Sequence, residues 1–210
     1  MILTDVRPLI VENVDKVLTE AIDPKDNKKK TFQALRVTGV FQEANSHNAN
    51  SRIYPVDILK EAVQSIQHLI QARRVLGEFD HPADAKVHLD RASHLITKLW
   101  MEGNKVFGQA EVLDHLPYGN QLKGLIDHGV TVGISSRGVG DMESVMQEGR
   151  QFFRVLPGYM LITFDVVAEP SVSTAQLSVM ESVSRNRHNS TLIKKHNEYK
   201  ILQAFKKELL

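Results

Sequence analysis

Apolar residues recur at two spacings along this chain, and each spacing predicts a different kind of element. The run from Gln33 to Glu43 alternates roughly between apolar and polar positions and is rich in branched side chains, which predicts a strand. Residues 94–113 carry two such runs around Gly103 and Asn104, residue types that adopt positive φ readily, so a β-hairpin is expected there. Further extended segments are predicted at 130–140, 151–158 and 159–170, with the acidic stretch 141–150 as a connecting loop.

Helical spacing predominates in two other segments. Between residues 55 and 70 apolar residues recur at steps of three and four, which predicts one amphipathic helix with Pro55 at its first position. This apolar stripe consists of Ile58, Leu59, Ala62, Val63, Ile66, Leu69 and Ile70. A second helix is predicted from Pro117 to His128, ended by Gly129. Strands in hairpin-like succession with helices laid over them indicate an α+β fold, with a mostly antiparallel β-barrel or strongly curved sheet.

The two ends of the chain differ from its centre. Residues 1–20 are expected to form a short helix, followed at 21–30 by a lysine-rich linker that cannot bury much surface. After about Ser182 the composition becomes polar before a helical period resumes over 192–210. The sequence therefore predicts a leader and linker at 1–30, a main domain at 31–182, and a tether with a C-terminal helix at 183–210.

Composition narrows the classes of function. The 210 residues are 42% hydrophobic, which is enough for one well-buried core, and 26 basic against 25 acidic residues leave a net charge of +1. Such a balanced charge argues against nucleic-acid binding. Cys is absent, which excludes disulfides and cysteine nucleophiles. Charges interrupt the apolar runs, so neither a secretory signal nor a membrane span is expected, and the chain is predicted to be soluble.

Two short segments place a reactive side chain among residues that give the backbone freedom. GEFDHP, at 77–82, contains His81, and GISSRG, at 133–138, contains Ser135. A serine hydroxyl becomes a good nucleophile when a base takes its proton, and the oxyanion that forms needs backbone donors close by. The glycines around Ser135 would let the chain turn sharply, which makes the amides of Arg137 and Gly138 candidates for an oxyanion hole.

The residues alone leave other interpretations open. A serine between glycines is typical of an ordinary turn, and a histidine before proline is typical of a loop. Ser136 competes with Ser135 as nucleophile, because alternation along a strand sends the two to opposite faces. The Arg137 side chain is either solvated or orients the oxyanion loop. A metal-dependent hydrolase is a further alternative, because several candidate metal ligands surround His81 in the sequence. These are Asp80, Asp84, His88, Asp90 and His94. Their spacing, however, fits no familiar zinc-binding pattern.

Three ordered motifs, together with NSRIYP before the first predicted helix, resemble those of the prohead core serine proteases of tailed bacteriophages, which are related to the herpesvirus assemblins. The motifs are GEFDHP, GISSRG and, at 164–171, FDVVAEPS, and the likeness covers about residues 33–174.

This resemblance implies an assemblin-like fold in which His81 is the general base and Ser135 the nucleophile. It points to Asp165 as the third catalytic residue, with Glu169 as the alternative, whereas the assemblins use a second histidine. An unpaired carboxylate within the apolar run LITFDVVA would be costly, which also favours a dedicated partner for Asp165.

The resemblance further implies a role in capsid maturation. A protease of this family sits with the scaffold inside the immature capsid, or prohead, in the host cytoplasm, where it degrades scaffolding proteins and trims capsid proteins without a cofactor. Members are zymogens that process themselves, often after Glu in a Leu-x-Glu or Ile-x-Glu context. That pattern predicts self-cleavage after Glu12 or Glu20, while a match at Glu61 falls in a predicted helix. Self-association of the chain is left open, and a catalytically silent scaffold or capsid-core component is the alternative function.

Overall fold

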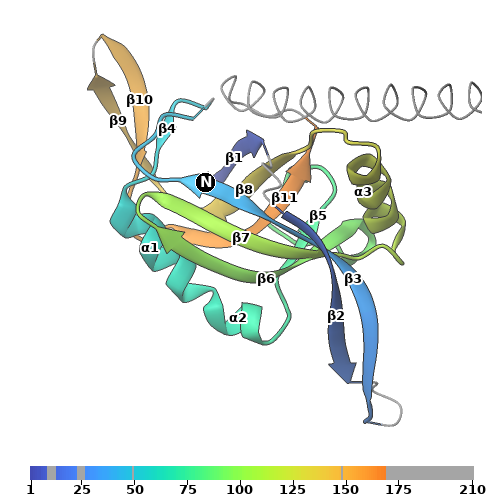
Figure 1. Ribbon diagram of the computed structural model, residues 1–210. Helices are drawn as coiled ribbons and strands as arrows, with labels where there is room; N and C mark the ends of the chain where they lie inside the picture. Colours follow the sequence, from blue (N-terminus) through green and yellow to red (C-terminus); the bar gives the residue numbers. More distant parts are fainter. Residues whose placement is uncertain (9–12, 23–26, 49, 148, 169–210) are drawn as a thin grey trace, which may run out of the picture. The chain divides into compact units, whose positions relative to one another are not determined.

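The computed structural model describes residues 1–8, 13–22, 27–48, 50–147 and 149–168, and these belong to a compact unit spanning Met1–Val172 (Figure 1). The helices of this part of the chain are α1 (Val56–Ser65), α2 (Gln67–Gln71), a 3-10 turn at Leu89–Arg91, and α3 (Pro117–Asp127). The strands are β1 (Ile2–Pro8), β2 (Asn13–Ile22), β3 (Lys29–Glu43), β4 (Arg52–Ile53), β5 (Leu76–Glu78), β6 (Ala92–Glu102), β7 (Lys105–Val112), β8 (Gly133–Val139), β9 (Met142–Gln147), β10 (Arg150–Val155) and β11 (Met160–Val167). The predicted C-terminal helix lies outside the described residues.

The largest sheet has the strand order β2-β3-β7-β6-β5, with antiparallel pairing throughout. The hairpin predicted at 94–113 is confirmed as β6 and β7, which turn at Gly103 with φ +60°. Helix α1 follows Pro55, which caps the helix with extended backbone angles instead of forming its first turn. The predicted apolar stripe is confirmed, because Ile58, Leu59 and Val63 are all buried in the core.

A second sheet, of order β1-β8-β11, carries the two motifs that follow residue 130. Strand β8 lies in the middle and pairs antiparallel with both neighbours. In the core, the ring of Phe164 on β11 contacts Phe41 of β3 edge-on, at a centroid distance of 5.2 Å. Apolar burial between these two sheets therefore holds β8 and β11 against the larger sheet.

Helix α3 confirms the second predicted helix. Pro117 occupies its first turn, Leu122 is buried, and the chain leaves the helix at Gly129 with φ +68°. Positive φ is the conformation that glycine adopts without a steric penalty, so Gly129 acts as the expected C-terminal cap.

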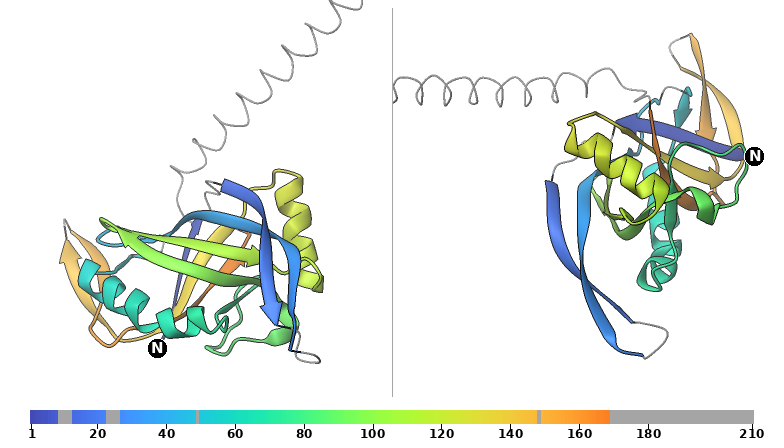
Figure 2. Two further views of the ribbon diagram at one scale, coloured as in Figure 1. Left: turned by 60° about the horizontal axis from the view of Figure 1, so that its bottom comes forward. Right: turned by 90° about the vertical axis from the view of Figure 1, so that its right-hand side faces the viewer.

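The prediction of a short helix over residues 1–20 was wrong. Strand β1 pairs with β8, and strand β2 pairs with β3 along its whole length. The leader is rich in branched residues, and pairing with distant strands satisfies its backbone donors and acceptors, so tertiary contacts override the local helical spacing. In Figures 1 and 2, β2 and β3 form a long hairpin.

The acidic stretch 141–150 is also not a loop. Its first part forms β9, which pairs antiparallel with β10, while β10 pairs parallel with the short β4. Glu143 and Ser144 of β9 are exposed to solvent. The polar composition that suggested a loop therefore reflects the exposure of this strand.

The fold class is confirmed as α+β, with several antiparallel sheets and few helices. None of the three sheets closes into a barrel within the described residues, because pairing of the large sheet ends at β2 on one side and at the three-residue β5 on the other. The more specific assemblin-like arrangement stays a prediction. Of the helices in this part of the chain, none is long and apolar enough to span a bilayer.

Candidate active site

The segment GEFDHP leaves the large sheet and crosses to the second sheet. Strand β5 ends at Glu78, and Phe79 then forms a parallel bridge with Val166 of β11. Asp80 adopts φ +71°, its amide donates to the Val166 carbonyl at 2.6 Å, and its carboxylate accepts from the His81 amide at 2.9 Å. This turn directs the His81 side chain toward β8 and β11.

Ser135 and Asp165 are cross-strand partners in the ladder between β8 and β11. Directly opposed residues of an antiparallel pair project to the same face of the sheet. Ser135 therefore faces Asp165, whereas Ser136 projects to the other face, where its hydroxyl is buried with no hydrogen-bond partner among the described residues. Of the two serines, the structure brings only Ser135 to His81.

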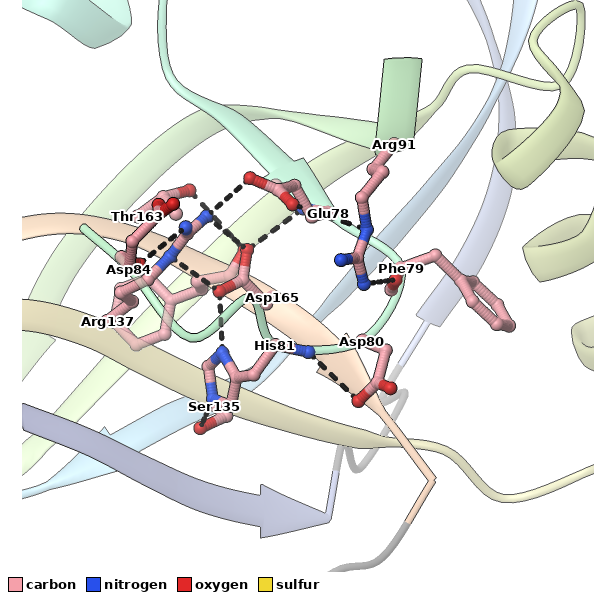
Figure 3. A network of polar contacts seen from close by, with 12 residues as sticks. Glu78, Phe79, Asp80, His81, Asp84, Arg91, Ser135, Arg137, Thr163 and Asp165 are labelled. Atoms are coloured by element: carbon pink, nitrogen blue, oxygen red, sulfur yellow. Dashed lines mark hydrogen bonds and ion pairs between the residues drawn. The ribbon is translucent and has the colours of Figure 1, made fainter. Parts of the chain in front are cut away.

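Ser135, His81 and Asp165 form a continuous line of contacts (Figure 3). The imidazole Nδ1–H donates to Asp165 Oδ2 at 2.7 Å, and the Ser135 hydroxyl donates to Nε2 through a short hydrogen bond. A carboxylate on Nδ1 fixes the tautomer that leaves Nε2 free to accept the serine proton. Ser135 and Asp165 are fully buried, while the His81 side chain is 17% exposed. The arrangement can perform general-base-assisted nucleophilic attack.

The Arg137 side chain is buried behind this line instead of lying in solvent. Its Nε is 2.9 Å from Asp165 Oδ2, and its Nη2 donates to Asp165 Oδ1 at 3.1 Å and to Glu78 Oε1 at 2.9 Å. The Glu78 amide also donates to Asp165 Oδ1, at 2.9 Å. Arg137, Glu78 and Asp165 are each 0% exposed. Of the two alternatives for the Arg137 side chain, the solvated one was wrong.

Glu78 is the residue of this site that sequence reasoning missed. It lies within GEFDHP, three positions before His81, but a glutamate in a short motif gives no local sign of burial. Its side-chain carboxylate accepts from Arg137 on β8 and from the His88 amide in the loop after β5, so only the tertiary fold reveals its role. The one sequence feature that could have indicated a role for Glu78 is its place in the motif that also contains His81.

The glycines of both motifs have a different role from the one expected. Ser135 lies in the regular strand β8, and no sharp turn surrounds it. Gly138 is required because a Cβ there would collide with the Tyr159 ring, and a Cβ at Gly77 would collide with the His94 ring. Both glycines thus allow close packing next to the site.

The predicted oxyanion donors lie in this regular strand as well. In the ladder, Arg137 is opposite Thr4 of β1 and Thr163 of β11, and Gly138 is opposite Leu3 and Leu161. Consecutive amides of a strand point to opposite edges, and both residues are paired in the ladder, so their donor role stays a prediction.

The acidic and histidine residues around His81 do not gather into a metal site. Among the described residues, no group of three His, Asp or Glu side chains could hold a metal ion. His94 is buried on β6, where its Nε2–H donates to the Phe164 carbonyl at 3.0 Å and Nδ1 contacts Ser93 Oγ at 2.9 Å. Burial lowers the pKa of His94 to about 4, so its ring is neutral at physiological pH. His88 contacts Asp84 and Glu78 at 3.6 and 3.5 Å.

Two of the remaining candidates fall outside the described residues, namely Glu12 and Glu169. Glu20 lies in β2, where its carboxylate is exposed and forms an ion pair of 2.8 Å with Lys29.

Comparisons with known proteins agree with this geometry. Residues 7–186 match the profile of a family described as "Prohead core protein serine protease". The chain is 35% identical over 175 residues to the "Prohead core protein protease" of Enterobacteria phage T4, covering 81% of this chain and 80% of that relative. Its fold is similar to that in a solved structure of the bacteriophage T4 capsid assembly protease gp21, with a TM-score of 0.68 and 29% identity, and the match covers 81% of this chain and 98% of the chain in that structure.

Proposed function

The chain belongs to the family of prohead core protein serine proteases, and from this premise we propose that Ser135, His81 and Asp165 carry out its peptide hydrolysis. The observation that carries the proposal is the unbroken line of contacts from the Ser135 hydroxyl through the His81 ring to the buried Asp165 carboxylate. No other serine in the described part of the chain is paired with a histidine in this way.

The chemistry follows from these contacts. Ser135 Oγ attacks the carbonyl carbon of the substrate while its proton passes to His81 Nε2, and Asp165 stabilises the imidazolium that results. The tetrahedral intermediate collapses when His81 returns the proton to the leaving amine, which leaves an acyl ester on Ser135. Water then repeats the same two steps and releases the acid. The amides of Arg137 and Gly138 are the proposed oxyanion donors.

The proposed substrates are the scaffolding and capsid proteins of the phage, cleaved inside the prohead in the host cell. The names of the two T4 relatives support this setting, since one is a prohead core protein protease and the other a capsid assembly protease. Cleavage after Glu is the expected specificity, and a pocket for that side chain would need a cation or several donors.

Self-processing of the leader is proposed on two further observations. Strand β1 pairs with the edge of β8, with Val6 opposite Ser135, and Ser135 is fully buried. An extended substrate would add most simply as a strand to this same edge. The precursor is thus closed while β1 holds the edge, and removal of the leader after Glu20, or after Glu12, opens it.

The proposal is tested by hydrolysis of denatured casein. Ser135→Ala is expected to reduce the rate by roughly 10⁴-fold or more, because the nucleophile is lost while binding remains. Ser136→Ala is the matched control, since that neighbouring hydroxyl is buried on the opposite face of β8, and it should retain activity. Undiminished cleavage by Ser135→Ala would overturn the assignment, and inactivity of the unaltered chain together with its procapsid would favour a silent scaffold component.

A further inference from the structure

We propose that Glu78 is the charge-balancing partner of Arg137, so that Arg137 can hold Asp165 in place without cancelling its effect on His81. The inference rests on the proposed function of Ser135, His81 and Asp165. Both Glu78 and Arg137 are positioning residues here, because neither contacts the serine or the imidazole. They act through Asp165, which contacts His81 directly.

Asp165 is held through contacts to both of its carboxylate oxygens. Its Oδ2 faces both His81 Nδ1, at 2.7 Å, and Arg137 Nε, at 2.9 Å. Its Oδ1 accepts from Arg137 Nη2 at 3.1 Å and from the Glu78 amide at 2.9 Å. The guanidinium therefore contacts both oxygens of the carboxylate, through a hydrogen bond to Oδ1 and an ion pair with Oδ2. These contacts restrain rotation of the carboxylate away from the imidazole.

The contact between Arg137 and Asp165 has an electrostatic cost for the protonation of His81. Arg137 places a permanent positive charge on the same oxygen that must stabilise the His81 imidazolium. Like charges so close together in a buried site oppose each other strongly, because little water screens them. With Arg137 and Asp165 alone, the buried group would be neutral before proton transfer and would carry a net charge of +1 after it.

Glu78 removes this difficulty. Its carboxylate is fully buried and accepts from Arg137 Nη2 at 2.9 Å and from the His88 amide at 2.8 Å. The two carboxylates and the guanidinium then sum to a charge of −1, and transfer of the serine proton to His81 brings the buried group to neutrality. Glu78 thus restores the field that favours the imidazolium.

Other charged or titratable groups also face Glu78 or Asp165, and they must be separated from this effect. Arg91 Nε is 3.7 Å from Glu78 Oε2, with its side chain one-third exposed, and His88 Nδ1 is 3.5 Å from Glu78 Oε1. From β6, the buried His94 faces Asp165 as a neutral ring. Asp84 contacts His88, and Asp80 contacts the His81 amide.

The test is the pH dependence of kcat/KM, measured after the chain has removed its leader, for the variant Glu78→Gln, an isosteric change that keeps a hydrogen-bonding side chain beside Arg137. The buried group becomes more positive by one charge, so the imidazolium that forms on proton transfer is less stable. The acid limb of the profile should move to lower pH by about one unit, and the plateau should fall roughly tenfold. A residue that only supports the fold would lower the plateau and leave the limb in place.

Three variants control the comparison. Glu111→Gln is the matched change, because Glu111 is also buried in ion pairs with two arginines but lies on β7 outside the site, and its acid limb should coincide with that of the unaltered chain. Arg137→Gln combined with Glu78→Gln restores the original net charge, so the limb should return to within roughly 0.3 units of its original position while the plateau stays low. The comparison is repeated in a His88→Gln background, where the same shift is expected.

Arg91→Gln provides an independent reading if Glu78→Gln does not fold. It removes a positive charge beside Glu78 from a partly exposed position, and the acid limb should move the opposite way, to higher pH, by roughly half a unit. An unmoved limb in the folded Glu78 variant, or in Arg91→Gln where the former is unstable, overturns the inference. Activity that persists in Ser135→Ala would instead overturn the proposed function itself, so the two failures are distinct.

Discussion

At the residue scale, the catalytic line depends on side chains that take part in no chemical step. His94 is one of them, because its Nε2–H donates to the Phe164 carbonyl, directly before Asp165 on β11. The ring occupies the space that a side chain at Gly77 would need. His94 therefore fixes the spacing between β5, which leads into the turn that carries His81, and β11, which carries Asp165.

Burial of His94 predicts a pH-dependent stability. The pKa of its ring falls from 6.5 to about 4 on folding, so between these values the unfolded chain binds a proton that the folded chain does not. The free energy of unfolding must then decrease as pH falls through this window. Relative to His94→Gln, the unaltered chain should lose roughly 2 kcal/mol more between pH 7 and pH 4.5.

Urea unfolding of both chains at the two pH values measures this difference. The comparison cancels the carboxylates that titrate in the same range, since both chains contain them. A difference in stability that stays constant between pH 7 and pH 4.5 would show that His94 does not remain neutral in the folded chain.

At the scale of elements, the leader connects two sheets in different ways. Strand β1 pairs with the strand of the nucleophile, whereas β2 is the edge strand of the large sheet and pairs, within the described part of the chain, only with β3. An edge strand can separate from its neighbour at lower cost than a central strand, and its extended backbone is the conformation that proteases bind. Glu20 is exposed on β2 near the end of the hairpin.

Incubation of the active chain should therefore remove residues 1–20, and Glu20→Gln should slow this cleavage at least tenfold, which is a loss of about 1.4 kcal/mol of transition-state stabilisation. Intact-mass spectrometry follows the reaction. Glu61→Gln is the control: Leu59, Lys60 and Glu61 fit the same pattern but lie in α1, where Leu59 is fully buried. An active chain with an intact N-terminus would contradict the prediction, as would a block of processing by Glu61→Gln.

At the scale of the whole molecule, the sequence predicted what depends on local spacing. The stripe along α1, the hairpin at Gly103 and the cap at Gly129 all follow from residues close together in the chain. The N-terminal strands could not be predicted in this way, because the pairing of β1 with β8 and of β2 with β3 forms only in the folded chain.

The site shows the same division. Ser135 lies 54 positions from His81, so local chemistry could name them as candidates but could not place them together, and motif resemblance supplied the pairing. Resemblance also selected Asp165, which the structure places 2.7 Å from the His81 ring. Glu78 and the buried Arg137 side chain could not be assigned, since their contacts join β5, β8 and β11 only after folding.

The most direct test is covalent labelling with diisopropyl fluorophosphate of chains whose leader has first been removed by a small amount of active protease, followed by peptide mass spectrometry. A hydroxyl activated by His81 and Asp165 should form one phosphoryl adduct, on Ser135, and His81→Ala should slow its formation by several orders of magnitude while Ser136→Ala leaves it unchanged. An adduct on Ser136, or equal labelling of the chain with Ser135→Ala, would contradict the catalytic role of this site.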